Sequence, residues 1–257
     1  MTALRKLEKW VIKGERLLRS TVFGQQCLTA LLIFAGVGFI SQDSLALFAA
    51  AAPSEDSERS NYCDGKYQEG ALNGFYKCVF PSGNRYQGEL KNSQRHGQGT
   101  LIYADGTRCE GEFRNNFLIR GICQFSRGDR YEGEWQNQQR QGVGVMIYAN
   151  GTRCEGSFRD DQLDGAGKCM FASGNRYNGE FRHNQRQGRG TFIYADGTQC
   201  FGWFQADIMN GLGDCLFANG DRYTGEFRRN QLTGRGVYTF KDGQRVEGNW
   251  QQGVFEE

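Results

Sequence analysis

The stretch YQGELKNSQRHGQGTLIYADGTR occupies residues 86–108, and its pattern returns seven more times before the chain ends. The copies begin 22 or 23 residues apart, at Tyr86, Cys109, Tyr131, Cys154, Tyr177, Cys200, Tyr223 and Val246. A looser ninth copy begins at Cys63. A fixed short period indicates a stack of equivalent supersecondary units, so this repeat decides the fold.

Within each copy, side-chain size alternates with a period of two. Positions 1, 3 and 5 carry Tyr or Cys, then Gly, then an aromatic residue in most copies, and positions 14, 16 and 18 alternate in the same way. This alternation predicts two strands, each with one buried face. A polar segment such as KNSQRHG separates the strands, and an Asp-Gly or Asn-Gly dipeptide follows the second one. Each copy is therefore predicted to be a β-hairpin, and the dipeptide to turn the chain into the next hairpin because it tolerates positive φ.

The expected register sets position 1 opposite position 18. Tyr86 then faces Tyr103, and Leu90 faces Gly99, so large residues lie against small ones. The aromatic residues expected to share one face of the sheet are Tyr86, Phe113, Tyr131, Trp135, Phe158, Tyr177, Phe181, Phe204, Tyr223, Phe227 and Trp250.

The 86–108 segment resembles the MORN repeat, a hairpin module, because it carries that family's Tyr, Gly, Glu, paired Gly and Asp-Gly in place. The resemblance covers residues 63–257. It implies an all-β fold: an elongated, single-layer, twisted antiparallel sheet of stacked hairpins. Family members are mostly scaffolds and membrane-associated or dimerising modules. Some carry a lipid kinase or SET-domain methyltransferase region, for which this chain has no room.

The N-terminal 52 residues have a different composition. Residues 1–19 hold six basic residues and predict a basic helix, and residues 27–40 are densely apolar. Two interpretations remain open: a signal peptide cleaved near residues 49–51, or an uncleaved transmembrane helix over residues 20–42. Both place the N-terminus in the cytoplasm and the repeats on the extracytoplasmic side. We therefore expect a membrane or export segment over 1–52, a polar linker over 53–62 and the repeat array over 63–257.

Eight of the nine cysteines recur in pairs, at positions 1 and 16 of alternate copies. The pairs are Cys63 with Cys78, Cys109 with Cys123, Cys154 with Cys169, and Cys200 with Cys215. An even number of cysteines behind an export signal indicates a disulfide framework, and we hypothesise that each pair closes its own hairpin. The expected register sets the two positions diagonally, so a shifted register is one alternative. Reduced cysteines left by duplication of a 46-residue unit are another.

The sequence predicts no catalytic site, no metal site and no cofactor. Its two histidines, His96 and His183, fall in separate expected loops. Cysteine pairs two hairpins apart would lie ~19 Å from each other, too far to share a zinc ion. The glutamates at position 4 are expected on a solvated face. Position 10 alternates between arginine and apolar residues, which predicts either a docking strip or the trace of a duplication: Arg95, Arg140 and Arg186 against Leu72, Leu163 and Met209.

The charge distribution narrows the functional classes. Residues 1–19 hold six basic and two acidic residues, whereas the net charge of the whole chain is only +2, so the repeats are close to neutral. A neutral array argues against nucleic-acid binding, which needs a basic footprint. We expect a non-catalytic scaffold that binds a protein partner and reaches the membrane through its N-terminal segment. The alternative is a lipid-binding module that uses the aromatic face, and the resemblance makes self-association an expectation as well.

Overall fold

The computed structural model describes residues 62–256 except 65, 68 and 69. These residues belong to two compact units, which we call the N-terminal unit (62–185) and the C-terminal unit (186–256). The predictions for residues 1–52 and for the linker up to residue 61 lie outside the described residues. Within the described part, no helix is long and apolar enough to cross a membrane.

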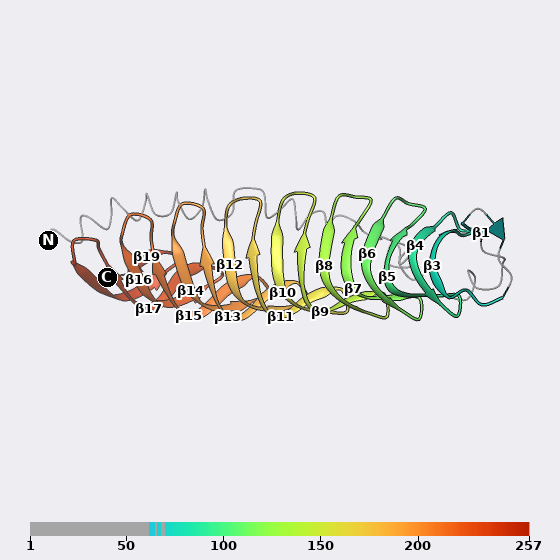
Figure 1. Ribbon diagram of the computed structural model, residues 1–257. Helices are drawn as coiled ribbons and strands as arrows, with labels where there is room; N and C mark the ends of the chain where they lie inside the picture. The colour runs from blue at the N-terminus through green and yellow to red at the C-terminus, as the bar shows by residue number, and fades with distance from the viewer. Residues whose placement is uncertain (1–61, 65, 68–69, 257) are drawn as a thin grey trace, which may run out of the picture. The chain divides into compact units, whose positions relative to one another are not determined.

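The N-terminal unit consists of strands joined by turns (Figure 1). Its strands are β1 (Tyr62–Cys63), β2 (Lys66–Tyr67), β3 (Gly74–Val79), β4 (Arg85–Lys91), β5 (Gln94–Ile102), β6 (Arg108–Arg114), β7 (Phe117–Gln124), β8 (Arg130–Gln136), β9 (Gln139–Ile147), β10 (Arg153–Arg159), β11 (Gln162–Met170) and β12 (Arg176–Arg182).

The C-terminal unit repeats the same design. Its strands are β13 (Gln185–Ile193, in this unit from residue 186), β14 (Gln199–Gln205), β15 (Ile208–Leu216), β16 (Arg222–Arg228), β17 (Gln231–Thr239), β18 (Arg245–Gln251) and β19 (Val254–Glu256). The last copy therefore closes a short hairpin of its own, in which Gln251 pairs with Val254.

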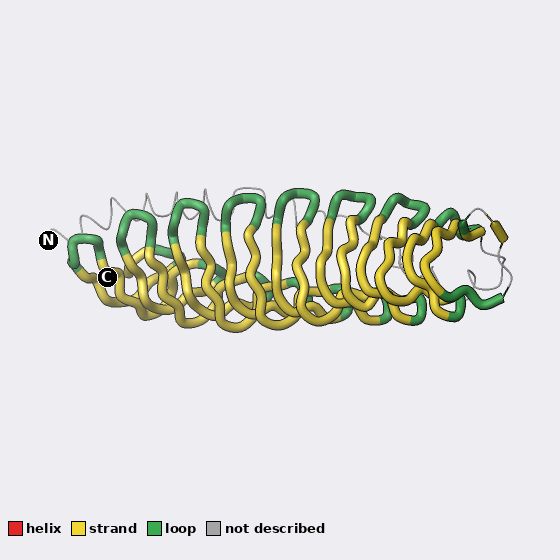
Figure 2. Tube along the Cα trace, viewed as in Figure 1, coloured by secondary structure: helices red, strands yellow, loops and turns green. Residues whose placement is uncertain are grey.

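Consecutive strands from β3 onward in each unit pair antiparallel, so each unit is an open sheet of hairpins in chain order. Figure 2 shows the strands running between two rows of turns. One face of each strand is buried and the other exposed, as in the alternating burial along β4 and β16. The predicted all-β, antiparallel hairpin fold is confirmed, and its cause is the period-two alternation of side-chain size.

The predicted register is wrong by two residues. Tyr86 pairs with Leu101, and Gly88 pairs with Gly99. The last four residues of the segment expected to be a loop, 94–97, begin β5, because the hairpin turn contains only two residues. A bulge between Gly88 and Leu90 then absorbs two extra residues of β5, so the register shifts along the hairpin. The same shift sets positions 1 and 16 directly opposite each other.

The two rows of turns have different chemistry. At the hairpin tips, the two central residues of the turn both have positive φ, 51° at Asn92 and 61° at Ser93, as in the type I′ turns that match strand twist. Between hairpins, only the glycine of the predicted Asp-Gly turn has positive φ, which is 90° at Gly106. The Asp105 carboxylate instead accepts a hydrogen bond from the Thr107 N–H at 2.8 Å. Aspartate therefore suits this position because its side chain accepts this hydrogen bond, and not because it adopts a positive φ.

Candidate interaction surface

Two kinds of hairpin alternate along each unit, and they fill the buried face differently. We call them Tyr-type and Cys-type hairpins after the residue at position 1. In the Tyr-type hairpin of β4 and β5, the Tyr86 side chain is 2% exposed and lies over the paired glycines. A Cβ atom added at Gly99 would lie 2.3 Å from the Tyr86 hydroxyl oxygen, so glycine is needed there. The hydroxyl donates a hydrogen bond to the main-chain carbonyl of Glu89 at 3.0 Å.

The other Tyr-type hairpins repeat this arrangement. Tyr131, Tyr177 and Tyr223 each donate to the main-chain carbonyl three residues later, at 3.2 Å. The Tyr131 ring also meets Trp135 and Phe158 edge-on, with centroids 5.1 Å apart in both pairs. Each tyrosine thus packs on its own hairpin, and Tyr131 also contacts the following one.

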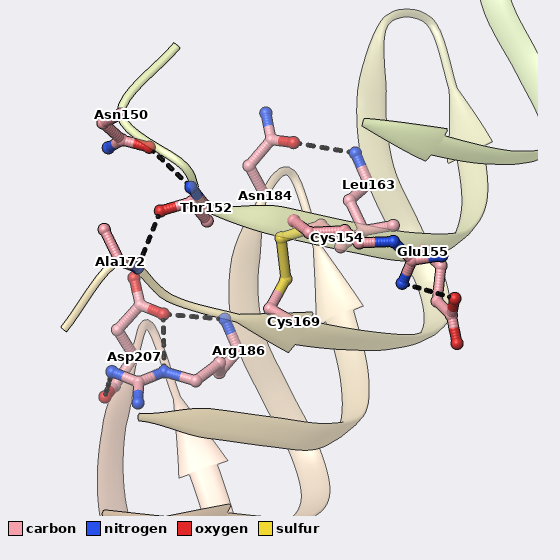
Figure 3. The surroundings of a disulfide bond; sticks show 11 residues. Asn150, Thr152, Cys154, Glu155, Leu163, Cys169, Ala172, Asn184, Arg186 and Asp207 are labelled. Atoms are coloured by element: carbon pink, nitrogen blue, oxygen red, sulfur yellow. Dashed lines mark hydrogen bonds and ion pairs between the residues drawn. A yellow bond between two sulfur atoms is a disulfide. The ribbon is translucent and has the colours of Figure 1, made fainter. Parts of the chain in front are cut away.

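In the Cys-type hairpins, the two cysteines are directly opposite and lie at disulfide distance. The sulfur atoms of Cys154 and Cys169 are 2.04 Å apart, and their Cα atoms 4.1 Å (Figure 3). The same geometry joins Cys63 with Cys78, Cys109 with Cys123, and Cys200 with Cys215. All eight cysteines are buried. The shifted register, which was the alternative interpretation, is what allows each pair to close its own hairpin.

The aromatic residues expected on one face all lie on the buried side of the hairpins. Ten of them are at most 6% exposed: Tyr86, Phe113, Tyr131, Phe158, Tyr177, Phe181, Phe204, Tyr223, Phe227 and Trp250. Trp135 is half-buried. The ten buried side chains are occupied by contacts within the chain and leave little surface for a bilayer.

Burial also changes the acid–base properties of the tyrosines. Removal from water raises the pKa of Tyr86, Tyr131 and Tyr223 to about 12. Burial raises the pKa of Tyr238 as well, and the hydrogen bond of its hydroxyl to the Asp221 carboxylate, at 2.8 Å, adds to the shift. These hydroxyls remain protonated donors at neutral pH.

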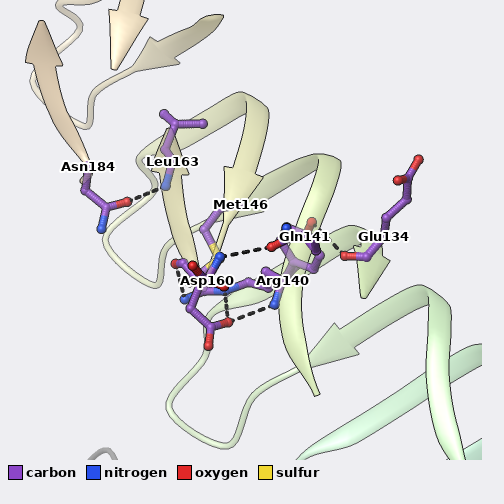
Figure 4. Close-up of polar contacts among 9 residues, drawn as sticks. Glu134, Arg140, Gln141, Met146, Asp160, Leu163 and Asn184 are labelled. Atoms are coloured by element: carbon purple, nitrogen blue, oxygen red, sulfur yellow. Dashed lines mark hydrogen bonds and ion pairs between the residues drawn. The ribbon is translucent and has the colours of Figure 1, made fainter. Parts of the chain in front are cut away.

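The predicted docking strip at position 10 is wrong, because its residues join neighbouring hairpins. The Arg140 N–H and Nε both donate to the Asp161 carboxylate at 2.9 Å, and Nη2 donates to the Asp161 main-chain carbonyl at 2.8 Å. The Leu163 N–H donates to Asn184 Oδ1 at 2.8 Å (Figure 4). The apolar members of the strip, Leu72, Leu163 and Met209, are buried. Residues at the tip of one hairpin therefore accept hydrogen bonds from the backbone of the preceding hairpin.

The opposite face of the strands is exposed and carries pairs of charges. In three successive hairpins of the N-terminal unit, an arginine contacts the glutamate two residues later. The pairs are Arg108 with Glu110, Arg130 with Glu132 at 2.8 Å, and Arg153 with Glu155 at 2.7 Å. Both partners are largely solvated, so these pairs contribute little stability and mainly fix the carboxylates in place.

A shallow groove of about 830 Å³ crosses this outer face of the N-terminal unit. Its floor is backbone, since the paired glycines lie beneath it. Its lining includes the carboxylates of Glu110, Glu112, Glu132 and Glu134 and the guanidinium of Arg120, which contacts Glu134 at 3.2 Å. Phe75 and Val143, 60% and 67% exposed, also line it. The groove offers hydrogen-bond acceptors beside apolar contact area.

The C-terminal unit has its own exposed apolar residues. Phe201 and Trp203 in β14 are 52% and 49% exposed. The repeat pattern does not single them out, because its recurring large residues fall at positions 1 and 5, on the buried face. The signal was present at positions 2 and 4, which are polar or charged in every other copy.

Nothing in the described residues resembles a catalytic or metal centre. His96 lies in β5, while His183 lies in a turn. Among the described residues, no group of three or more histidine, cysteine, aspartate or glutamate side chains could hold a metal ion. The arrangement can bind a partner on its outer face.

Comparisons with known proteins agree with the repeat pattern. The family model described as "MORN repeat" matches residues 86–108, 131–153, 154–176, 177–199, 202–222 and 223–245, more than half of the chain. No curated protein matches the sequence.

Two solved structures show a distant similarity. The TCP domain of SAS-4 (dCPAP) from Drosophila melanogaster, in complex with a proline-rich motif of Ana2 (dSTIL), is 14% identical. The match has a TM-score of 0.41 and covers 72% of this chain and 96% of that one. The wild-type TCP10 domain of Danio rerio CPAP is 13% identical, with a TM-score of 0.29, over 68% of this chain and 84% of that one. Neither similarity carries a statement about function.

Proposed function

Because the chain belongs to the MORN repeat family, we propose that it is a non-catalytic scaffold that binds a protein partner across the outer face of its hairpins. MORN repeats are protein- or membrane-interaction modules, and the family generally acts without catalysis. The observation that carries the proposal is the division of the two faces. The buried face is filled by tyrosines and cysteine pairs, which leaves the outer face to meet a partner.

The groove of the N-terminal unit is the first place on that face for a partner to bind. Its carboxylates are held by arginines, but each carboxylate can accept more than one hydrogen bond. Phe75 and Val143 supply apolar contacts beside them. These features favour an extended protein segment that carries lysine, arginine or amide donors together with small apolar side chains.

The scaffold is proposed to work on the extracytoplasmic side of the cytoplasmic membrane, anchored by residues 20–42 or released after cleavage near residues 49–51. The cysteine pairs support this location, because cysteines facing each other at disulfide distance suit an oxidising compartment. Sequencing the N-terminus of the protein from its host separates the two forms. A start near residue 50 means cleavage, and a start at residue 1 or 2 means an anchor.

The binding role is tested by photo-crosslinking in the host cell. A benzophenone amino acid replaces Val143 in the groove, and in a control variant it replaces the exposed tip residue Arg229. The proposal expects discrete adducts with another protein at Val143 and none at Arg229. The absence of protein adducts from Val143, and from an equivalent series along the outer face, would contradict the proposed function. Self-association stays a prediction, and sedimentation equilibrium tests it.

A further inference from the structure

Strand β14 breaks the pattern of the outer face. Positions 2 and 4 of the other copies hold Asp, Gln, Glu, Asn, Thr, Lys or Ser, whereas β14 holds Phe201 and Trp203. Burial alternates along this strand, so both aromatic side chains lie on the exposed face. Leu212 and Leu216 of β15, 67% and 46% exposed, lie on the same face. We call these four residues the β14–β15 patch.

The acidic group inside the patch, Asp214, is engaged within the chain. Two oxygens of Asp214 accept hydrogen bonds from Arg222 Nε at 2.8 and 3.0 Å, and the Thr224 hydroxyl donates to one of them at 2.7 Å. The Glu226 carboxylate lies against Gly234 in the bulge of β17. Asp214 lies between Leu212 and Leu216 and pairs with Phe201, so it is inside the patch, whereas Glu226, which pairs with Leu212, lies at its edge.

Arg189 is the cation beside the patch. It pairs with Trp203 across β13 and β14, and its guanidinium carbon lies 5.2 Å from the centre of the Trp203 ring. Among the described residues it forms this cation–π contact and no ion pair. A partner therefore finds a cation beside an apolar surface, and the complementary group is a carboxylate.

The size of the patch limits what can cover it. Its four half-exposed side chains offer on the order of 400 Å², whereas each partner in a stable protein complex buries about 800 Å². A second copy of the chain would need much more contact than the patch supplies. A bilayer is also disfavoured, because Phe201 and Trp203 lie in the middle of a strand. Inserting them would remove Asp214, Arg222 and Glu226 from water on the same face.

The spacing fits an extended peptide. Phe201 and Trp203 are two residues apart on one strand, which separates them by about 6.6 Å. Alternate side chains of an extended segment lying along β14 have the same spacing and would contact both rings. Tryptophan and arginine, which meet here, are the residues that dominate binding energy in many interfaces.

We infer that the β14–β15 patch is the docking site for an extended segment of a partner protein, with apolar side chains at alternate positions and an aspartate or glutamate that reaches Arg189. This inference rests on the proposed scaffold function, but it concerns a site and a peptide chemistry different from those of the groove.

The test uses the full chain as the cell produces it and a phage-displayed library of random 12-residue peptides. Selected peptides are expected to share two apolar residues separated by one position, with an acidic residue nearby. The double variant Phe201→Thr, Trp203→Glu should weaken their binding at least tenfold. It places at both positions a residue that other copies carry there, so its melting temperature should match the wild type. Arg189→Gln should weaken only the peptides that carry the acidic residue.

The control variant is Met170→Ser, which removes an exposed apolar residue outside both the patch and the groove and should leave peptide binding unchanged. The inference is overturned if no peptide is enriched, or if enriched peptides bind the double variant as well as the wild type. It is also overturned if the patch instead mediates binding to phosphatidylglycerol vesicles or dimerisation, either of which the double variant would abolish. Protein adducts at Val143 together with any of these results would reject this site alone and leave the scaffold function standing.

Discussion

Tyr-type and Cys-type hairpins share one pair of glycines and, except for the copy from Cys109, which is one residue shorter, one length, yet they fill the buried face with different chemistry. A Tyr-type hairpin covers its glycines with a large ring whose hydroxyl is tied to the backbone. A Cys-type hairpin places two cysteines opposite each other instead. The register is therefore a property of the turn and bulge, and the buried side chains exploit it in two ways. The Tyr-type hairpin gains packing, while the Cys-type hairpin gains a crosslink.

Breaking one crosslink should give the largest effect. The double variant Cys154→Ala, Cys169→Ala removes a disulfide that closes a loop with a sequence separation of 15. Freeing that loop in the unfolded chain should lower the free energy of unfolding by about 3 kcal/mol, measured by denaturant titration under oxidising conditions. In reducing buffer, the variant and the wild type should converge. An equal stability of the two proteins without reductant would show that the pair is not crosslinked.

Glycine substitutions should distinguish the two hairpin types. A Cβ at Gly99 would collide with the Tyr86 side chain, whereas a Cβ at Gly121 would lie 2.2 Å from the main-chain oxygen of Glu110. Either change to alanine should destabilise the protein by about 1–3 kcal/mol. Shortening the tyrosine in Gly99→Ala, Tyr86→Leu should recover part of the loss.

No side-chain substitution should rescue Gly121→Ala in the same way, because the added Cβ would collide with main-chain atoms. A double-mutant cycle on urea titrations measures the coupling between residues 99 and 86. Strict additivity of the Gly99 and Tyr86 changes would contradict the packing described here.

Alkaline pH should destabilise the protein by ionising the buried tyrosines of the Tyr-type hairpins. The pKa of the Tyr131 hydroxyl is raised to about 12 in the folded protein, and an exposed tyrosine ionises near 10. A raised folded pKa means that the stabilisation is complete below pH ~10 and is lost as the pH rises through about 12. Melting temperatures should therefore fall between pH 10 and 12, while absorbance of tyrosinate rises with unfolding. Tyrosinate absorbance that develops near pH 10 without unfolding and is missing from the Tyr131→Phe variant would contradict the burial of Tyr131.

The smallest effects should come from single hydrogen bonds. Tyr131→Phe removes the donor to the Glu134 carbonyl, and Asn184→Ala removes the acceptor of the Leu163 N–H. Each should cost about 1 kcal/mol in thermal or urea denaturation. Arg108→Ala, which breaks a solvated ion pair on the outer face, serves as the matched control and should be close to neutral. A larger loss of stability from Arg108→Ala than from Tyr131→Phe would contradict the conclusion that the buried face, and not the outer face, stabilises the fold.

The hairpin fold could be predicted from the sequence because the repeat shows the same alternation in every copy. The pairing of Cys109 with Cys123 was also within reach, since cysteine occupies both positions or neither. The strand register could not be predicted, because it depends on a two-residue turn and a bulge. Neither has a strong signal: Asn92 and Ser93 adopt positive φ without a glycine.

The binding surface was harder to predict than the fold. Arg140 and Leu163 looked like a surface strip because their alternation follows the repeat, but alternation alone does not say which side of a strand is buried. Phe201 and Trp203 were overlooked for the opposite reason: they depart from the repeat. In a repetitive chain, the recurring residues build the fold, and residues that break the recurrence are the better candidates for function.

The most direct test of the alternating hairpins is a disulfide map of the protein taken from its host, obtained by mass spectrometry of a non-reduced digest. The account predicts four links, each within one hairpin: Cys63 to Cys78, Cys109 to Cys123, Cys154 to Cys169, and Cys200 to Cys215. Eight free thiols, or a link between cysteines of different hairpins, would contradict it.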